Sequence, residues 1–129
     1  MKITKSLLLF SLLFFHVQTV QTMGSNNGLP KEIFRHWVHS YEEDTREAKV
    51  FRPGNYNFPR SRGRFGFEIK ENGEFVQYGI GPADRPARIS GYWKAEGKDK
   101  INVYFEDKES ASYAINIISC TEDVLMIKK

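Results

Sequence analysis

The sequence predicts an all-β fold, an antiparallel up-and-down meander of about eight short strands that closes into a small barrel. Apolar and polar residues alternate with a period of two along successive short runs between Arg64 and Lys128, the pattern of half-buried strands. Turn residues separate these runs so closely that hairpins, and not helical crossovers, must connect them. Pairing of the first strand with the last would remove the exposed edges that make open sheets prone to aggregation.

The first two strands are expected before the least regular part of the chain. Pro30 suits the first position of a single helical turn. Residues 37–41 then alternate as a strand, and residues 48–52 form a second strand that the turn signal Pro53-Gly54 ends. Residues 55–63 follow as a loop that is longer than a usual connection, and such loops are more often functional than tight hairpins.

A hairpin is the most secure local prediction. Residues 64–70 and 74–80 alternate on either side of Asn72-Gly73, which predicts a type I′ turn with positive φ at both central residues. A second long, irregular loop follows at residues 81–88. The remaining strands are expected at residues 90–95, 101–106, 113–119 and 124–128.

The N-terminus is separate from this fold. Lys2 and Lys5 precede the apolar run at residues 7–15, which is the anatomy of a secretory signal peptide. The run is shorter than the ~20 apolar residues of a membrane span. We therefore expect a signal peptide at residues 1–24 and a secreted or periplasmic single domain at residues 25–129. No Ala-x-Ala cleavage site is present, so an uncut N-terminal anchor is the alternative.

Charge and cysteine content limit the functional classes. The chain has 19 basic and 16 acidic residues. Without residues 1–24, which contain two lysines and no acid, 17 basic and 16 acidic residues remain, a net charge of about +1. This balance gives no support to nucleic-acid binding or to a polybasic membrane patch. The single cysteine, Cys120, cannot form an internal disulfide, and we expect it to be packed at a strand end rather than reactive.

Four short motifs resemble the second half of small lipocalin-like domains found in exported bacterial proteins. They are Gly91-Tyr-Trp93, Ile101-Asn-Val103, Tyr113-x-Ile115 and Asp123-x-Leu125-x-Ile127. Trp37 is also similar in position to the tryptophan that plugs one end of such barrels. The resemblance covers residues 35–129 and implies a calycin-type barrel, whose larger members bind small apolar ligands. This chain lacks the paired cysteines of many secreted lipocalins.

No motif predicts catalysis, a metal site or a cofactor. His36 and His39 are three residues apart, which places them on opposite faces of a strand and argues against a shared metal ion. Ser61 and Ser119 lie in no nucleophile elbow. We therefore expect a protein that is not an enzyme, although a hydrolase site assembled only in three dimensions is a third alternative.

The two long loops carry the best candidate site. Arg62 and Arg64 point the same way if the chain is extended, and guanidinium groups suit carboxylate, phosphate or sulfate. The predicted ligand-binding residues are Tyr56, Arg62, Arg64, Arg88 and Trp93. In the alternative interpretation these arginines face solvent, stack on Tyr78 or Tyr104, and pair with Glu68 and Glu74.

These residues lead to two main functional hypotheses. In the first, a monomeric barrel binds a small amphipathic or anionic ligand at its mouth. In the second, aromatic side chains fill the core, and the loops serve a protein-interaction module such as a secreted inhibitor or an envelope component. The volume inside the barrel distinguishes the two.

Overall fold

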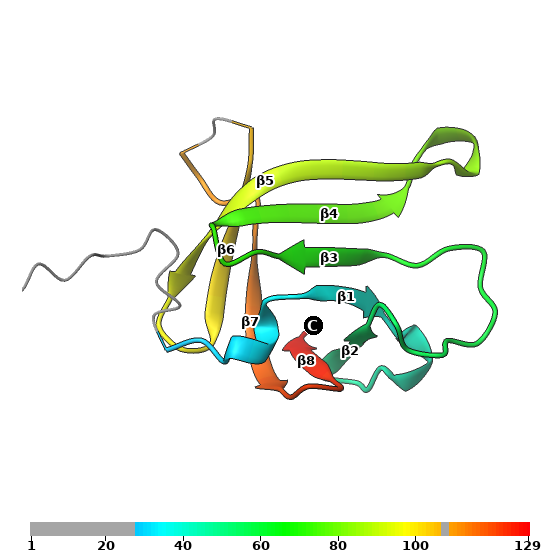
Figure 1. Cartoon of the computed structure of the whole chain (residues 1–129), viewed down its shortest axis with the longest axis horizontal. Coiled ribbons are helices and arrows are strands. Elements are labelled where there is room, and N and C mark those ends of the chain that lie inside the picture. Colours follow the sequence, from blue (N-terminus) through cyan, green and yellow to red (C-terminus); the bar gives the residue numbers. More distant parts are fainter. Residues whose placement is uncertain (1–27, 107–108) are drawn as a thin grey trace, which may run out of the picture.

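The computed structural model describes residues 28–106 and 109–129, which form an eight-stranded antiparallel closed β-barrel (Figure 1). The predicted fold class is confirmed. The signal peptide expected at residues 1–24 lies outside the described residues. No helix among the described residues is long and apolar enough to cross a membrane.

The strands follow the predicted runs with small shifts at their ends. They are β1 (His36–His39), β2 (Ala48–Pro53), β3 (Gly66–Ile69), β4 (Glu74–Ile80), β5 (Pro86–Glu96), β6 (Lys100–Phe105), β7 (Tyr113–Cys120) and β8 (Leu125–Lys128). The described residues also include short 3-10 helices: η1 (Lys31–Ile33) precedes β1, η2 (Tyr41–Glu43) lies between β1 and β2, and η3 (Pro82–Asp84) lies between β4 and β5. β5 begins earlier than expected because residues 86–89 extend its pairing with β4.

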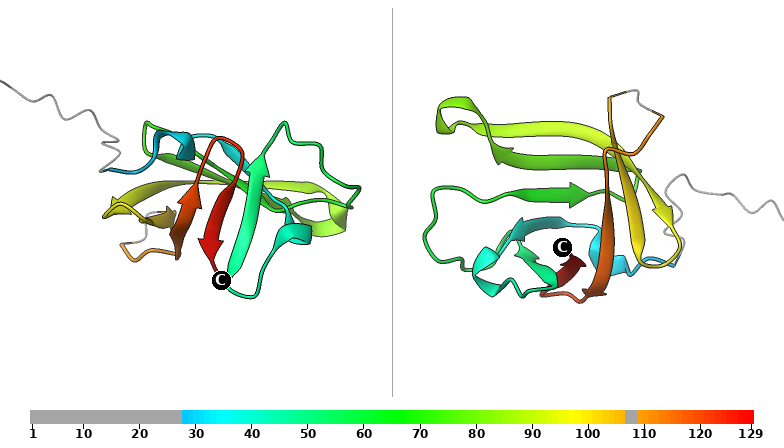
Figure 2. Two further views of the ribbon diagram at one scale, coloured as in Figure 1. Left: turned by 90° about the horizontal axis from the view of Figure 1, so that it is seen from below. Right: turned by 180° about the vertical axis from the view of Figure 1, so that it is seen from behind.

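The strand order around the barrel departs from a simple meander at one place. β3 to β8 are neighbours in sequence order, but β1 lies between β2 and β3 and pairs with both. The barrel therefore closes through β2 and β8, which pair over residues 48–51 and 125–128, and the expected pairing of the first strand with the last is wrong. Figure 2 shows β8 beside β2 in the view from below.

This insertion explains the long segment between β2 and β3. Both strands run antiparallel to β1, so they point in the same direction and cannot be joined by a tight hairpin. The connecting segment leaves beside one end of β1, where the Gly54 N–H donates to the His36 carbonyl at 3.2 Å. It returns beside the other end, where the His39 N–H donates to the Phe65 carbonyl at 2.8 Å. The length of residues 54–65 therefore has a topological cause.

The hairpin between β3 and β4 forms with a different turn from the predicted one. The Gly73 N–H donates to the Lys70 carbonyl at 3.1 Å, and Gly73 has φ of 94°. Asn72 is not among the described residues with positive φ, so the type I′ prediction is wrong. A turn that ends in one left-handed glycine is the next common hairpin connection, and it needs positive φ only at Gly73.

Aromatic and aliphatic side chains fill the barrel and close one end. Trp37 is fully buried, and its indole N–H donates to the Ile33 carbonyl at 3.0 Å. Trp93 is buried and donates to the Lys70 carbonyl at 2.8 Å, while its ring packs against Phe34 at 5.7 Å between centroids. Each buried indole N–H thus has a partner, as burial requires. We call this the closed end of the barrel.

Candidate functional site

The opposite end, where β2, β3 and β7 begin and β8 ends, is open and holds a pocket of about 320 Å³. We call it the mouth pocket. It is lined by Lys49, Phe51, Phe65, Phe67, Tyr113, Ala114, Ile115, Ile127, Lys128 and Lys129. Phe51 and Phe67 are almost completely buried, and Phe65 is 39% exposed, so the apolar wall of the pocket extends from the core to the solvent.

The period of the strands explains why lysines lie at the rim of an apolar pocket. Lys49 is two residues before Phe51 on β2, and Lys129 is two residues after Ile127 on β8. Alternate residues of a strand face the same side. In both β2 and β8, the row of side chains that faces into the barrel therefore ends in a lysine at the mouth. Lys49 also lies directly opposite Ile127 in the ladder between β2 and β8. These lysines are not among the residues predicted for the site, although the alternation at the strand ends contained the signal.

The rim is positively charged. Lys49, Lys128 and Lys129 are all exposed. Within residues 28–106 and 109–129, none of the three forms an ion pair with an acidic side chain. Their ammonium groups therefore remain available to a bound anion.

A hydrogen bond that crosses the barrel limits the pocket on one side. The Tyr113 hydroxyl donates to Gln77 Oε1 at 2.9 Å, although β5 and β6 lie between their strands in the barrel order. Burial raises the pKa of the Tyr113 hydroxyl well above its ordinary value, so the hydroxyl remains protonated as a donor. Its ring packs against Phe75 and Phe105 at 6.1 and 6.0 Å between centroids.

The structure gives Arg64 a role in holding the segment between β2 and β3, residues 54–65, which we call the crossover segment. Its guanidinium donates to both carboxylate oxygens of Glu42, at 2.8 and 2.5 Å, and to the carbonyl oxygens of His39 and Pro59. The pKa of Glu42 is lowered, mainly by the hydrogen bonds from Arg64. The Arg64 side chain is 8% exposed. Its donors are occupied by this chain and do not face the mouth pocket.

The rings of Tyr41 and Phe58 lie 4.7 and 4.8 Å from the Arg64 guanidinium carbon. Such cation–π contacts add to the hydrogen bonds. Arg64 therefore joins η2, the end of β1 and the crossover segment. The alternative interpretation expected arginines paired with Glu68 and Glu74, and the observed partner of Arg64 is Glu42.

The other predicted residues do not all lie beside Arg64. Arg62 lines a pocket of about 240 Å³ together with Arg64 and Asp84, so the two long loops meet there. Arg88 is exposed on β5. Tyr56 packs under the Arg52 guanidinium at 5.0 Å, and Trp93 is buried at the closed end.

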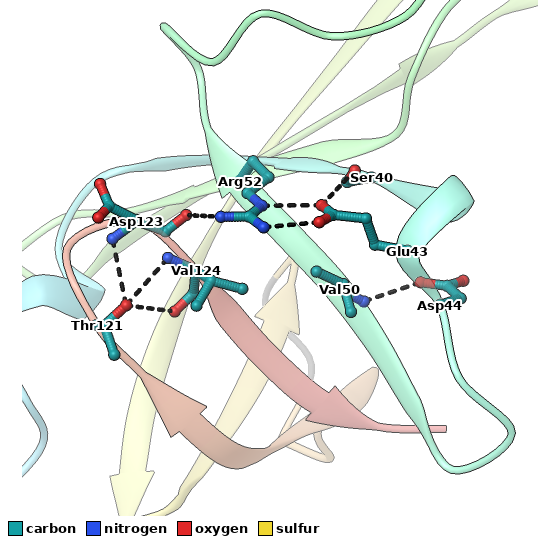
Figure 3. A network of polar contacts seen from close by, with 8 residues as sticks. All are labelled: Ser40, Glu43, Asp44, Val50, Arg52, Thr121, Asp123 and Val124. Atoms are coloured by element: carbon teal, nitrogen blue, oxygen red, sulfur yellow. Dashed lines mark hydrogen bonds and ion pairs between the residues drawn. The ribbon is translucent and has the colours of Figure 1, made fainter.

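A polar network holds the outside of the barrel together (Figure 3). Arg52 on β2 donates to both carboxylate oxygens of Glu43, at 2.8 and 2.6 Å, and to the Asp123 carbonyl at 3.2 Å. The buried Ser40 hydroxyl also donates to Glu43, at 2.8 Å. The hydrogen bonds from Arg52 lower the pKa of Glu43 to about 2. The network ties η2 to β2 and to the turn between β7 and β8, which is a structural role.

The histidines and the cysteine are also engaged in packing. The ring of His36 packs at a tilt against Tyr78, with 4.7 Å between centroids. His39 stacks on Phe51, and its Nε2 lies 2.9 Å from Asp44 Oδ2. No group of three or more His, Cys, Asp or Glu side chains among the described residues is placed to hold a metal ion. Burial raises the pKa of the Cys120 thiol to about 11, which disfavours the reactive thiolate.

The fold and this site define a class, an eight-stranded antiparallel closed β-barrel with an aromatic pocket and a lysine rim at its mouth. No family model matches the chain, and comparison with curated proteins and with solved structures likewise finds no match.

Proposed function

We propose that this protein binds a small amphipathic anion in the mouth pocket. The observation that carries the proposal is a pocket of about 320 Å³ with aromatic walls and three unpaired lysines at its rim, counted over the described residues. Mostly apolar pockets with a few placed polar groups are the usual form of small-molecule sites. The lysines take the place that we had predicted for Arg62, Arg64 and Arg88.

The two parts of the ligand have separate partners in this proposal. Its apolar body packs against Phe51, Phe65 and Phe67, where burial of apolar surface contributes about 25 cal/mol per Å². Its acidic group lies at the rim beside Lys49 and Lys129, which are flexible point charges suited to carboxylate, sulfate or phosphate. Because the barrel below Phe51 and Phe67 is filled, the ligand occupies the mouth only.

Anilinonaphthalene sulfonate, an aromatic anion that fluoresces in apolar surroundings, tests the proposal. We expect saturable binding to the folded protein that dodecanoate displaces and dodecyltrimethylammonium does not. The double variant Lys49→Gln/Lys129→Gln should weaken binding about tenfold, because two favourable charge interactions of under about 1 kcal/mol each are lost. Lys31→Gln/Lys98→Gln removes the same charge from exposed lysines near the closed end and should leave affinity within about twofold.

Two results would contradict this function. One is an equal loss of affinity in Lys49→Gln/Lys129→Gln and in the control Lys31→Gln/Lys98→Gln, which would show that binding depends on the net charge of the protein and not on the rim. The other is equal displacement by the cationic and the anionic amphiphile. Near-ultraviolet circular dichroism must show native packing in each variant, since the probe also binds partly unfolded states.

The second candidate function is a protein-interaction module. Its supporting observation is the filled barrel core, in which Trp37, Phe51, Phe67 and Phe75 are almost completely buried. In this alternative the loops, and not the mouth, carry recognition. It predicts no saturable binding of the sulfonate probe.

A further inference from the structure

Four arginines lie exposed at one end of the molecule. Arg60 and Arg62 belong to the segment between β2 and β3, and Arg85 and Arg88 belong to the end of the β4–β5 hairpin. We call these four residues the arginine tip. None of them forms an ion pair within the described parts of the chain, whereas Arg64 is held bidentately by Glu42.

The two segments that carry the arginine tip are adjacent. Both extend at the same end of the molecule in two opposite views (Figures 1 and 2). They share the pocket of about 240 Å³ that Arg62 and Asp84 line. A Cβ atom added to Gly63 would lie 2.7 Å from Cδ1 of Ile80, so the crossover segment touches the hairpin directly.

The charge at this end has a single sign. Asp84 is the one acidic residue in residues 54–65 and 79–90 of the sequence. Glu42 neutralises Arg64, but in these segments Asp84 is the one negative charge that offsets the four arginines of the tip. Local positive charge is therefore high, although the net charge of the chain after residue 24 is about +1.

Exposed apolar side chains accompany the arginines. Ile80 is 52% exposed at the end of β4, and Ile89 is 47% exposed on β5. From Gly91 onward, β5 pairs with β6. Residues 86–90 of β5 pair with β4 only, so this part of the hairpin projects from the barrel. A projecting element with branched apolar side chains beside unpaired guanidinium groups is suited to an interface that is both anionic and apolar.

We propose that the arginine tip docks on an anionic lipid surface with the end of the β4–β5 hairpin pointing into it, so that Ile80 on one face of the hairpin and Ile89 on the other both enter the interfacial region. Guanidinium groups bind lipid phosphates with paired hydrogen bonds, and each basic residue adds to the attraction of an anionic leaflet. The two isoleucines favour a lipid surface over an acidic polypeptide, which offers charge but no apolar layer. This inference is independent of the function proposed for the mouth pocket.

Co-sedimentation of the full chain with vesicles tests the inference. Vesicles of phosphatidylcholine alone measure binding that does not depend on anionic lipid, including any contribution from the apolar run at residues 7–15. Vesicles that also contain phosphatidylglycerol should bind more protein, and added salt should reduce this increment because it screens exposed charges.

Replacing all four arginines of the tip by glutamine should reduce the anion-dependent affinity at least tenfold, since each basic residue near such a surface contributes about fivefold. The matched control replaces Lys31, Lys94, Lys98 and Lys100 by glutamine, which removes the same charge from residues on or near the β5–β6 hairpin turn and η1. It should retain most of the increment. Ile80→Ser/Ile89→Ser should weaken binding at high salt, where the apolar contribution remains.

Three results would overturn the inference. The first is an unchanged increment in the arginine variant, and the second is an equal loss in the lysine control. The third combines two observations: polyglutamate binds as strongly as the vesicles do, and the isoleucine variant binds the vesicles as well as the natural protein does. Together they would assign the arginine tip to acidic polypeptides.

Discussion

Tyr113 and Gln77 are joined by a hydrogen bond of 2.9 Å between strands that are not neighbours in the barrel. Because β5 and β6 separate β7 from β4, the contact spans the interior and not the ladder of a sheet. It gives the Tyr113 ring a fixed position as a wall of the mouth pocket. The pocket therefore depends on a tertiary contact between residues that are 36 positions apart.

Tyr113→Phe tests this contact. The variant keeps the ring and removes the donor, which leaves Gln77 Oε1 without its partner, so we expect the free energy of unfolding to fall by about 1 kcal/mol. Affinity for the sulfonate probe should change less than twofold, because the apolar wall remains. Urea unfolding and probe titration measure the two effects. A large loss of affinity with unchanged stability would instead mean that the hydroxyl contacts the ligand.

Arg64 and Arg62 should respond differently to truncation. Both were predicted to bind a ligand, but Arg64 lies between Tyr41 and Phe58 and donates to two main-chain carbonyls. Arg64→Ala should lower the free energy of unfolding by about 1–2 kcal/mol through lost cation–π contacts and hydrogen bonds. Arg62→Ala, the matched control, should change it by less than about 0.5 kcal/mol. Equal effects in chemical denaturation would refute the structural role of Arg64.

The contribution of Glu43 should depend on pH. Its pKa in the folded protein is about 2, below the ordinary 4.5, mainly because Arg52 donates to it. The carboxylate therefore stabilises the fold fully above about pH 5, and this stabilisation is lost as the pH falls toward about 2. Glu43→Gln should be less stable than the natural protein by about 1–2 kcal/mol at neutral pH. The difference should shrink on acidification, and a difference that is constant across this range would contradict the pair.

Gly91 and Gly79 form a matched pair of glycines on paired strands. A Cβ atom at Gly91 would collide with the Tyr104 carbonyl, which is main chain and cannot rotate away. Gly79 has no heavy atom within 4 Å of such a Cβ atom. Gly91→Ala should therefore lower the free energy of unfolding by about 1–3 kcal/mol, whereas Gly79→Ala should be neutral or slightly stabilising. Thermal unfolding of the two variants compares them directly, and similar midpoints would show that β5 adjusts at no cost.

Local signals were sufficient for the strands but not for their order. The alternation of residues 66–69 and 74–80, with Gly73 between them, predicted the β3–β4 hairpin because neighbouring residues determine it. The position of β1 between β2 and β3 depends on pairing partners far apart in sequence, and no local pattern indicates it. The same limit applied to the site, because the length of the loop at residues 55–63 suggested recognition, whereas the strand order explains that length.

The alternation of apolar and polar residues is enough to predict a small antiparallel barrel, since a period of two decides which side chains face inward. Only the tertiary structure decided how the barrel closes, through β2 and β8, and which cations are free. Arg64 is occupied by Glu42, while Lys49 and Lys129 meet at the mouth. The physical reason is that alternation is local, whereas ion pairing and pocket formation depend on residues that folding brings together from distant strands.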